Sequence, residues 1–186
     1  SGITIDGNTA VFMQNSSVAN SRTFTLTRGT LGGNGTISTP ITIGPNVTLA
    51  PGDRTLGTPE AGVLTITNTV NLTGGTTEMR LFSPTDSDML VQSTLGGLTY
   101  GGILKITDLN PTAFAVGNTW DLFDFISQSG TFSNNSEFGT VGGTYLPLLT
   151  IDKNWSFAYT TGILSIAWGL LPGDTNGDRV VDAVDY

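Results

Sequence analysis

GTIS at residues 35–38, ITI at 41–43 and NVTL at 46–49 are short runs in which aliphatic residues alternate with threonine or serine. Gly, Pro or Asn residues separate each run from the next. A β-strand with one buried face has this two-residue period, and threonine favours strands without needing burial. Because similar runs recur from residue 3 to about residue 81, this part of the chain is predicted to form many short β-strands.

The connections between these runs bear on which all-β fold they form. One strand follows another every 6 to 12 residues or so, a spacing that suits either a β-sandwich or a β-solenoid. The turns GGNG (residues 32–35), GPN (44–46) and PGD (51–53) recur without the longer loops that Greek-key crossings need. This favours a β-solenoid, with β-helix-like rungs of short strands joined by tight corners.

The second half of the chain has longer and more apolar runs. All three Trp residues lie after about residue 76, so this half is predicted to hold the larger core, either as more solenoid or as a β-sandwich. No linker separates the halves. We therefore expect one β-domain over residues 1–169 and a separate C-terminal loop over residues 170–186.

Composition argues against several classes of function. The net charge is −8 and the seven Lys and Arg residues are scattered, which makes nucleic acid an improbable partner. The chain has no His, the commonest general base, and no Cys. No apolar run is long enough for a transmembrane segment.

Carboxylate pairs are the remaining catalytic candidates. Asp86 and Asp88 lie in a turn-forming stretch, where Asp usually bonds to nearby backbone. Asp121 and Asp124 differ by an odd number, so on one strand they would face opposite sides. We therefore expect no enzymatic activity and no catalytic residues.

The corners and strands of residues 31–37, 47–52 and 62–66 resemble the β-strand repeat of autotransporter passengers, which are large bacterial surface proteins. Residues 116–123 and 161–166 resemble the closing segment of the same proteins. The resemblance implies a β-solenoid or related fold, an extracellular or cell-surface location after secretion, and a structural or adhesive role.

The C-terminal segment 174–185 carries the most specific motif. Four of its twelve positions are Asp, and oxygen-bearing side chains occupy places 1, 3, 5, 9 and 12, with a backbone carbonyl at place 7. Calcium takes six to eight oxygen ligands from loops of this spacing. The predicted Ca²⁺ ligands are Asp174, Asn176, Asp178, Val180, Asp182 and Asp185.

This segment resembles the first calcium loop of a dockerin type I module. The resemblance implies docking to a cohesin-like protein, but a dockerin has two loops and only one is present before Tyr186, so the module would be incomplete. Arg179 also stands where the loop usually has Gly. The alternative is an acidic, solvated tail.

Three functions remain open. The first is a calcium-binding structural or adhesive protein that associates with itself, as a homo-oligomer or end to end into a fibre. The second is a calcium-dependent docking component. The third is a carbohydrate-binding module for a polysaccharide, in which aromatic side chains form a platform, although packing in the core is the favoured role for these residues. The aromatic residues are Trp120, Phe123, Phe125, Trp155 and Trp168.

Overall fold

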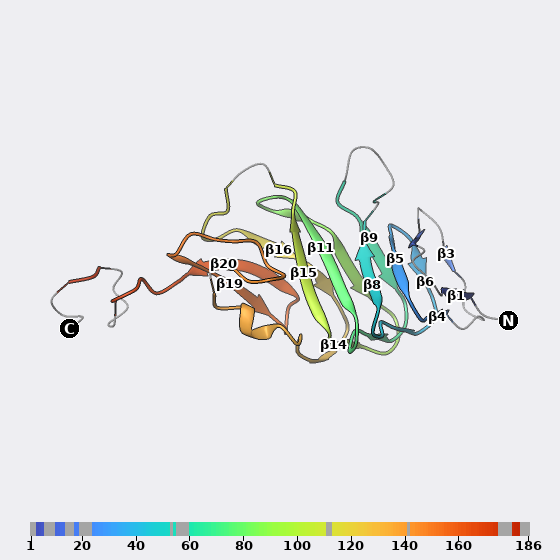
Figure 1. Ribbon diagram of the computed structural model, residues 1–186. Coiled ribbons are helices and arrows are strands. Elements are labelled where there is room, and N and C mark those ends of the chain that lie inside the picture. Colours follow the sequence, from blue (N-terminus) through green and yellow to red (C-terminus); the bar gives the residue numbers. More distant parts are fainter. Residues whose placement is uncertain are drawn as a thin grey trace.

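The computed structural model confirms the all-β prediction (Figure 1). One short 3₁₀ helix, η1 (Asn135–Glu137), accompanies the strands in the part of the chain that the structure describes. The described residues are 3–5, 10–13, 17–18, 24–52, 54, 60–110, 113–140, 142–174 and 180–182.

Most strands stack into three parallel faces, which we name A, B and C. Face A contains β2 (Ala10–Met13), β5 (Gly29–Gly33), β8 (Val47–Pro51), β11 (Thr76–Ser83) and β15 (Ile103–Asp108). Face B contains β3 (Ser17–Val18), β6 (Thr36–Ile37), β9 (Val63–Ile66), β13 (Met89–Gln92) and β17 (Phe123–Asp124). Face C contains β7 (Ile41–Thr42), β10 (Val70–Asn71), β14 (Leu98–Tyr100) and β18 (Gln128–Gly130), with the paired strands β1 (Ile3–Ile5) and β4 (Phe24–Leu26) beside them.

The chain passes from A to B to C and returns to A one level further along. This is a β-solenoid, as the sequence predicts. Parallel pairing aligns equivalent positions of successive turns: Thr30 opposes Thr48, which opposes Thr76. The neighbouring positions Leu31 and Leu49 also oppose each other, and both are fully buried. Since side chains alternate between the faces of a strand, each turn adds one apolar layer to the interior and one polar row outside.

The three corners of the solenoid differ in length. The B-to-C and C-to-A corners stay short in every turn, whereas the A-to-B corner carries the insertions. The connection after β8 extends to residue 62, and the one after β11 turns back to form β12 (Asp86–Ser87), which pairs antiparallel with β11. The connection after β15 is also long. The strands β8, β11 and β15 that these connections follow all end on the same side of face A (Figure 1).

Two glycines in the tight C-to-A corners allow a matched test of the stacking. Gly102 has φ +60°, and a Cβ there would collide with the carbonyl oxygen of Gly75 in the preceding turn. Gly44 occupies an equivalent corner, yet a Cβ there would meet nothing within 4 Å. We expect Gly102→Ala to lower the free energy of unfolding by about 1–3 kcal/mol. Gly44→Ala should leave it unchanged or raise it by up to about 1 kcal/mol.

Urea unfolding followed by circular dichroism measures both glycine variants. Equal midpoints for the two would show that the turns do not stack at this corner as described.

The C-terminal end of the solenoid is covered by an antiparallel sheet, which we call the cap sheet. Its strand order is β16 (Thr119–Asp121), β20 (Ile163–Trp168) and β19 (Lys153–Ala158). Its buried side chains join those of the last turn in the core, where aromatic rings pack 4.9 to 6.5 Å apart in two groups. One group contains Phe114, Trp120 and Trp155. The other contains Tyr100, Phe123, Phe125, Phe132, Phe138, Phe157 and Tyr159. The larger core predicted for this half is thus partly solenoid and partly cap sheet.

Backbone groups of the last face A strand are also covered. The side-chain amide of Asn134 accepts a hydrogen bond from the Leu104 N–H at 3.1 Å and donates one to the Leu104 carbonyl at 2.9 Å. The Ile106 N–H donates to the Tyr145 carbonyl oxygen at 2.8 Å. Because free N–H and C=O groups on an edge strand invite pairing with another chain, these contacts protect the C-terminal edge of face A.

Candidate functional site

The predicted calcium segment is described only in part. After β20 the chain leads away from the cap sheet (Figure 1). Asp174 is 5% exposed, and its N–H donates to the Leu171 carbonyl oxygen at 3.0 Å. Val180 and Asp182 are exposed. The other three predicted ligands, Asn176, Asp178 and Asp185, lie outside the described residues, so calcium binding here stays a prediction.

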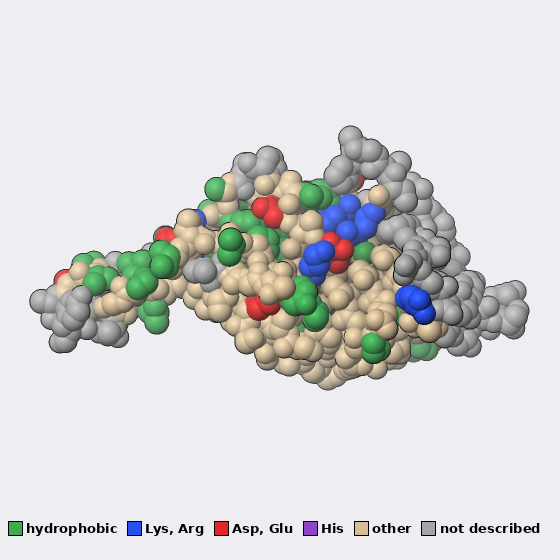
Figure 2. Space-filling model, viewed as in Figure 1, with side chains coloured by type: hydrophobic (Ala, Val, Ile, Leu, Met, Phe, Trp, Pro, Cys, Tyr) green, Lys and Arg blue, Asp and Glu red, His purple; other side chains and the backbone are tan. Residues whose placement is uncertain are grey.

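No group of three or more Asp or Glu side chains that could hold a metal occurs among the residues that the structure describes. Instead, charged side chains of opposite sign gather over the middle of the solenoid, while most of the described surface in this view is uncharged (Figure 2). This cluster, the face A network, consists of Arg54, Glu78, Arg80, Asp88, Lys105 and Thr107.

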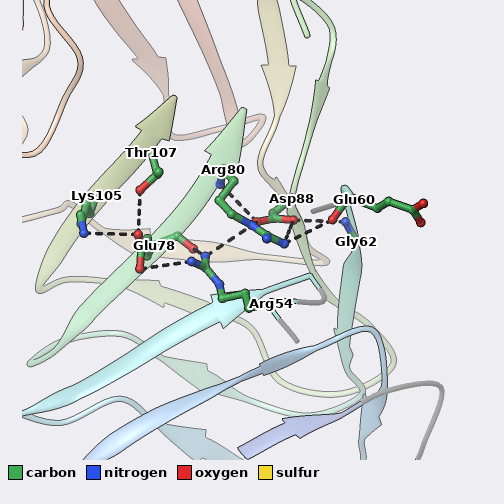
Figure 3. A network of polar contacts seen from close by, with 8 residues as sticks. All are labelled: Arg54, Glu60, Gly62, Glu78, Arg80, Asp88, Lys105 and Thr107. Atoms are coloured by element: carbon green, nitrogen blue, oxygen red, sulfur yellow. Dashed lines mark hydrogen bonds and ion pairs between the residues drawn. The ribbon is translucent and has the colours of Figure 1, made fainter. Parts of the chain in front are cut away.

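The centre of the face A network is a buried ion pair between Arg80 and Asp88 (Figure 3). Arg80 projects outward from β11 between the inward-facing Met79 and Leu81, yet the loop after β8 covers it, so that it is only 4% exposed. Its Nε lies 2.7 Å from Asp88 Oδ2, and its Nη2 lies 3.1 Å from Oδ1. A bidentate pair of this kind combines strength with fixed geometry.

Backbone groups complete the shell around the pair. The N–H groups of Arg80 and Gly62 each donate to the Asp88 carboxylate at 3.2 Å. Arg80 Nη2 also donates to the Glu60 carbonyl oxygen at 3.2 Å. The pair therefore joins β11, the β12 turn and the end of the loop after β8 through hydrogen bonds that pin this loop to face A.

A second, more exposed part of the network spans two turns. Arg54 Nη1 lies 3.4 Å from Glu78 Oε2, and its Nη2 donates to the Glu78 carbonyl oxygen at 3.2 Å. From β15, Lys105 lies 3.3 Å from Glu78 Oε1, and the Thr107 hydroxyl donates to the same oxygen at 2.7 Å. Arg54 also approaches Asp88 Oδ2 to 3.8 Å, linking the two parts.

Burial and charge act on these carboxylates in opposite senses. Burial raises the pKa of Asp88 above its ordinary value, although Arg80 and Arg54 favour its charged form. Burial would also raise the pKa of Glu78, but the Thr107 hydroxyl, Arg54 and Lys105 outweigh it and hold this pKa below its ordinary value. Each carboxylate is occupied by protein donors, so the network is suited to holding loops in place.

The two carboxylate pairs that were considered as catalytic candidates, and for which no catalysis is expected, differ in their surroundings. Asp88 is fully buried in the ion pair, whereas Asp86, two residues away, is exposed. These two carboxylates thus do not share a site. Asp88 accepts a hydrogen bond from the nearby backbone of Arg80, as the turn pattern predicts, and a second one from the distant backbone of Gly62.

The prediction for Asp121 and Asp124 needs a correction. The run 120–126, read as one strand, is divided: Asp121 ends β16 in the cap sheet, and Asp124 belongs to β17 in face B. The chain changes sheet at Leu122, whose N–H donates to the Gly162 carbonyl oxygen. Partial burial, followed by the charge of Asp124, raises the pKa of Asp121 above its ordinary value.

The aromatic residues considered as a sugar platform are mostly core residues. Trp120, Phe123 and Trp155 are fully buried, and the indole N–H groups of Trp120 and Trp155 donate to the Ser83 and Pro147 carbonyl oxygens. Packing in the core, the favoured role, is confirmed for these three. Phe125 is half-buried, and Trp168 is 55% exposed at the end of β20.

Sequence reasoning missed the face A network. A signal was present, because Glu78 and Arg80 place opposite charges at alternate outward positions of one strand in a chain with only seven Lys and Arg residues. The other members of the network come from several turns of the solenoid. Which of them meet depends on the number of residues in each turn, which cannot be read from the sequence alone.

The comparisons with known proteins give no relative. No protein-family model, curated protein or solved structure matches the chain.

Proposed function

We propose that this chain is an extracellular structural or adhesive protein, that it is not an enzyme, and that it binds calcium through its C-terminal segment and associates with itself. The observation that supports this best is the solenoid itself, an elongated stack in which every turn adds the same core layer and outer polar rows. Repeat architectures of this kind provide extended surfaces. Asp88, the most deeply buried carboxylate among the described residues, is fully engaged in hydrogen bonds to Arg80 and Gly62. These bonds hold a loop and leave Asp88 no evident catalytic role.

The covered edge of face A bears on how self-association occurs. The C-terminal edge of face A is covered by Asn134 and Tyr145, which lie between β18 and β19 and outside the cap sheet, so end-to-end growth at that edge would require this segment to move. We therefore propose that self-association occurs on the N-terminal side of the stack, through a second copy of the chain. No helix in the described part of the chain is long and apolar enough to cross a bilayer.

Calcium titration with light scattering on the same sample tests the proposal. We expect the wild-type chain to bind calcium with a Kd of about 10⁻⁴ to 10⁻³ M, as extracellular modules do, and to increase in particle size. Asp174→Ala combined with Asp178→Ala should abolish both effects, because it removes two of the predicted ligands.

The matched control is Asp86→Ala combined with Asp124→Ala, which makes the same change in net charge at two exposed positions outside the segment. It should bind calcium like the wild type. Equal binding by both double variants would contradict the predicted ligands. Calcium binding without an increase in size would contradict self-association and favour docking to another protein.

A further inference from the structure

A groove runs along the solenoid at the starts of the face A strands, opposite the end from which the long loops emerge. It consists of two adjoining hollows of 550 and 360 Å³ that share Asn46 and Thr48 in their lining. The first hollow reaches back to Thr30 on β5, and the second reaches forward to Thr76 on β11 and Ile103 on β15. Figure 1 shows these strand starts side by side along the solenoid.

The groove crosses successive turns because its floor is built from positions in register. Thr30 opposes Thr48, Thr48 opposes Thr76, and Thr76 opposes Ile103. Adjacent strands lie about 4.8 Å apart, so the three steps from Thr30 to Ile103 cover about 14 Å. A ligand that follows this groove must be extended and must lie along the solenoid axis.

Glycines from three different turns also line the groove, namely Gly29, Gly74, Gly75 and Gly102. Successive turns lie so close at Gly74, Gly75 and Gly102 that a Cβ there would meet the preceding turn within 3 Å, so backbone forms this part of the lining.

The first hollow is mostly polar, the second also includes the apolar Val47 and Ile103, and the whole lining is nearly uncharged. It offers the hydroxyls of Thr30, Thr48, Thr73, Thr76 and Ser133 together with the amide of Asn46. Arg28 is its one charged residue, at one end, and no carboxylate lines either hollow. Within the described part of the chain, no hydrogen bond joins the side chains of Thr30, Thr48 and Thr76 to another residue, so their hydroxyls are available to a ligand.

We propose that this axial groove binds an extended, neutral polysaccharide chain. Rows of hydroxyl and amide groups match the hydroxyls of sugars, each of which can both donate and accept a hydrogen bond. An acidic polymer is disfavoured because the protein carries a net charge of −8. A peptide strand is disfavoured because it needs a free sheet edge, whereas the floor here is the side-chain surface of paired strands.

This inference gives the proposed adhesive role a ligand class, and it rests on that role. No aromatic ring lines the groove, so binding would depend on many hydrogen bonds that are individually weak. The affinity should therefore increase with the length of the sugar chain until the groove is filled.

Affinity gel electrophoresis in calcium-free buffer tests the groove independently of the C-terminal segment. The gels contain soluble neutral polysaccharides (hydroxyethylcellulose, xyloglucan, mixed-linkage β-glucan, galactomannan or dextran) or, in parallel, the acidic polymers alginate and polygalacturonate. We expect at least one neutral polymer to retard the wild type and the acidic polymers not to do so. Thr48→Met and Thr76→Met remove a floor hydroxyl and fill the groove, and each should raise the apparent Kd about tenfold or more.

The matched control is Thr65→Met, which makes the same substitution at a half-buried position on face B, outside the groove. It should be retarded like the wild type, and circular dichroism verifies the fold of every variant. Retardation by no neutral polymer, retardation by acidic polymers alone, or equal loss in the Thr65 variant would overturn the proposal. Failure of the calcium and sizing experiment would leave these gel results unchanged, so the two failures are distinguishable.

Discussion

Replacing Asp88 with Asn is expected to lower the free energy of unfolding by about 3–5 kcal/mol, the usual cost of removing one partner of a buried ion pair. The substitution keeps the shape of the side chain but leaves the Arg80 guanidinium, only 4% exposed, without its counter-charge. It also turns one acceptor oxygen into an NH₂ group that faces donors from Arg80 and Gly62. Urea denaturation followed by tryptophan fluorescence measures the effect.

Asp86→Asn is the matched control, since it makes the same chemical change two residues away at an exposed position of the same turn. It should change the free energy of unfolding by no more than about 0.5 kcal/mol. A double variant, Arg80→Met with Asp88→Leu, should recover much of the lost stability, because it removes both buried charges. If the two Asn variants unfold at the same urea concentration, the buried pair does not hold the loop after β8 as described.

Trp155→Ala is expected to be about equally damaging, with a loss of about 3–5 kcal/mol from the cavity and the lost apolar contacts. The Trp155 ring is fully buried in the cap sheet and packs 5.3 Å from Phe114 and 5.9 Å from Trp120, centroid to centroid. Its indole N–H donates to the Pro147 carbonyl oxygen at 2.8 Å, so the loop before β19 loses a tether as well.

Trp168→Ala makes the same truncation on the neighbouring strand of the cap sheet, at a side chain that is 55% exposed. It should cost less than about 1 kcal/mol. Thermal unfolding monitored by circular dichroism compares the two variants with the wild type. Similar melting temperatures for both would mean that the cap sheet does not contribute to the stability of the solenoid.

The cap sheet and the face A network solve two problems of a solenoid. A stack of short strands leaves its last apolar layer and its last strand edge open. The rings around Tyr100 and Phe157 close the layer, and the Asn134 amide closes part of the edge. The insertions of the A-to-B corner are tied down by Arg80 and Asp88. The Asp88 variant tests the contacts that hold the A-to-B loops, and the Trp155 variant tests the cap sheet.

The sequence predicted the strands of the solenoid well and the rest less well. Runs such as residues 47–49 and 63–66 show their alternation in the printed sequence, and β8 and β9 follow it. The apolar run 120–126 has the pattern of a single strand, but the structure divides it between β16 in the cap sheet and β17 in face B, with the change of sheet at Leu122. The face A network escaped prediction because members in contact, such as Arg54 and Glu78 or Glu78 and Thr107, are 24 and 29 residues apart in the sequence.

The sequence by itself determined that the protein is all-β and built as a solenoid, because strand alternation and tight Gly, Pro and Asn corners are local properties of the chain. Only the tertiary structure decided which threonines stand in register, which corner carries the loops and how the last turn is covered. These features depend on the number of residues in each turn, and a shift of one residue would send every side chain of a strand to the opposite face. Thr30, Thr48 and Thr76 form one groove only because the lengths of successive turns bring them together.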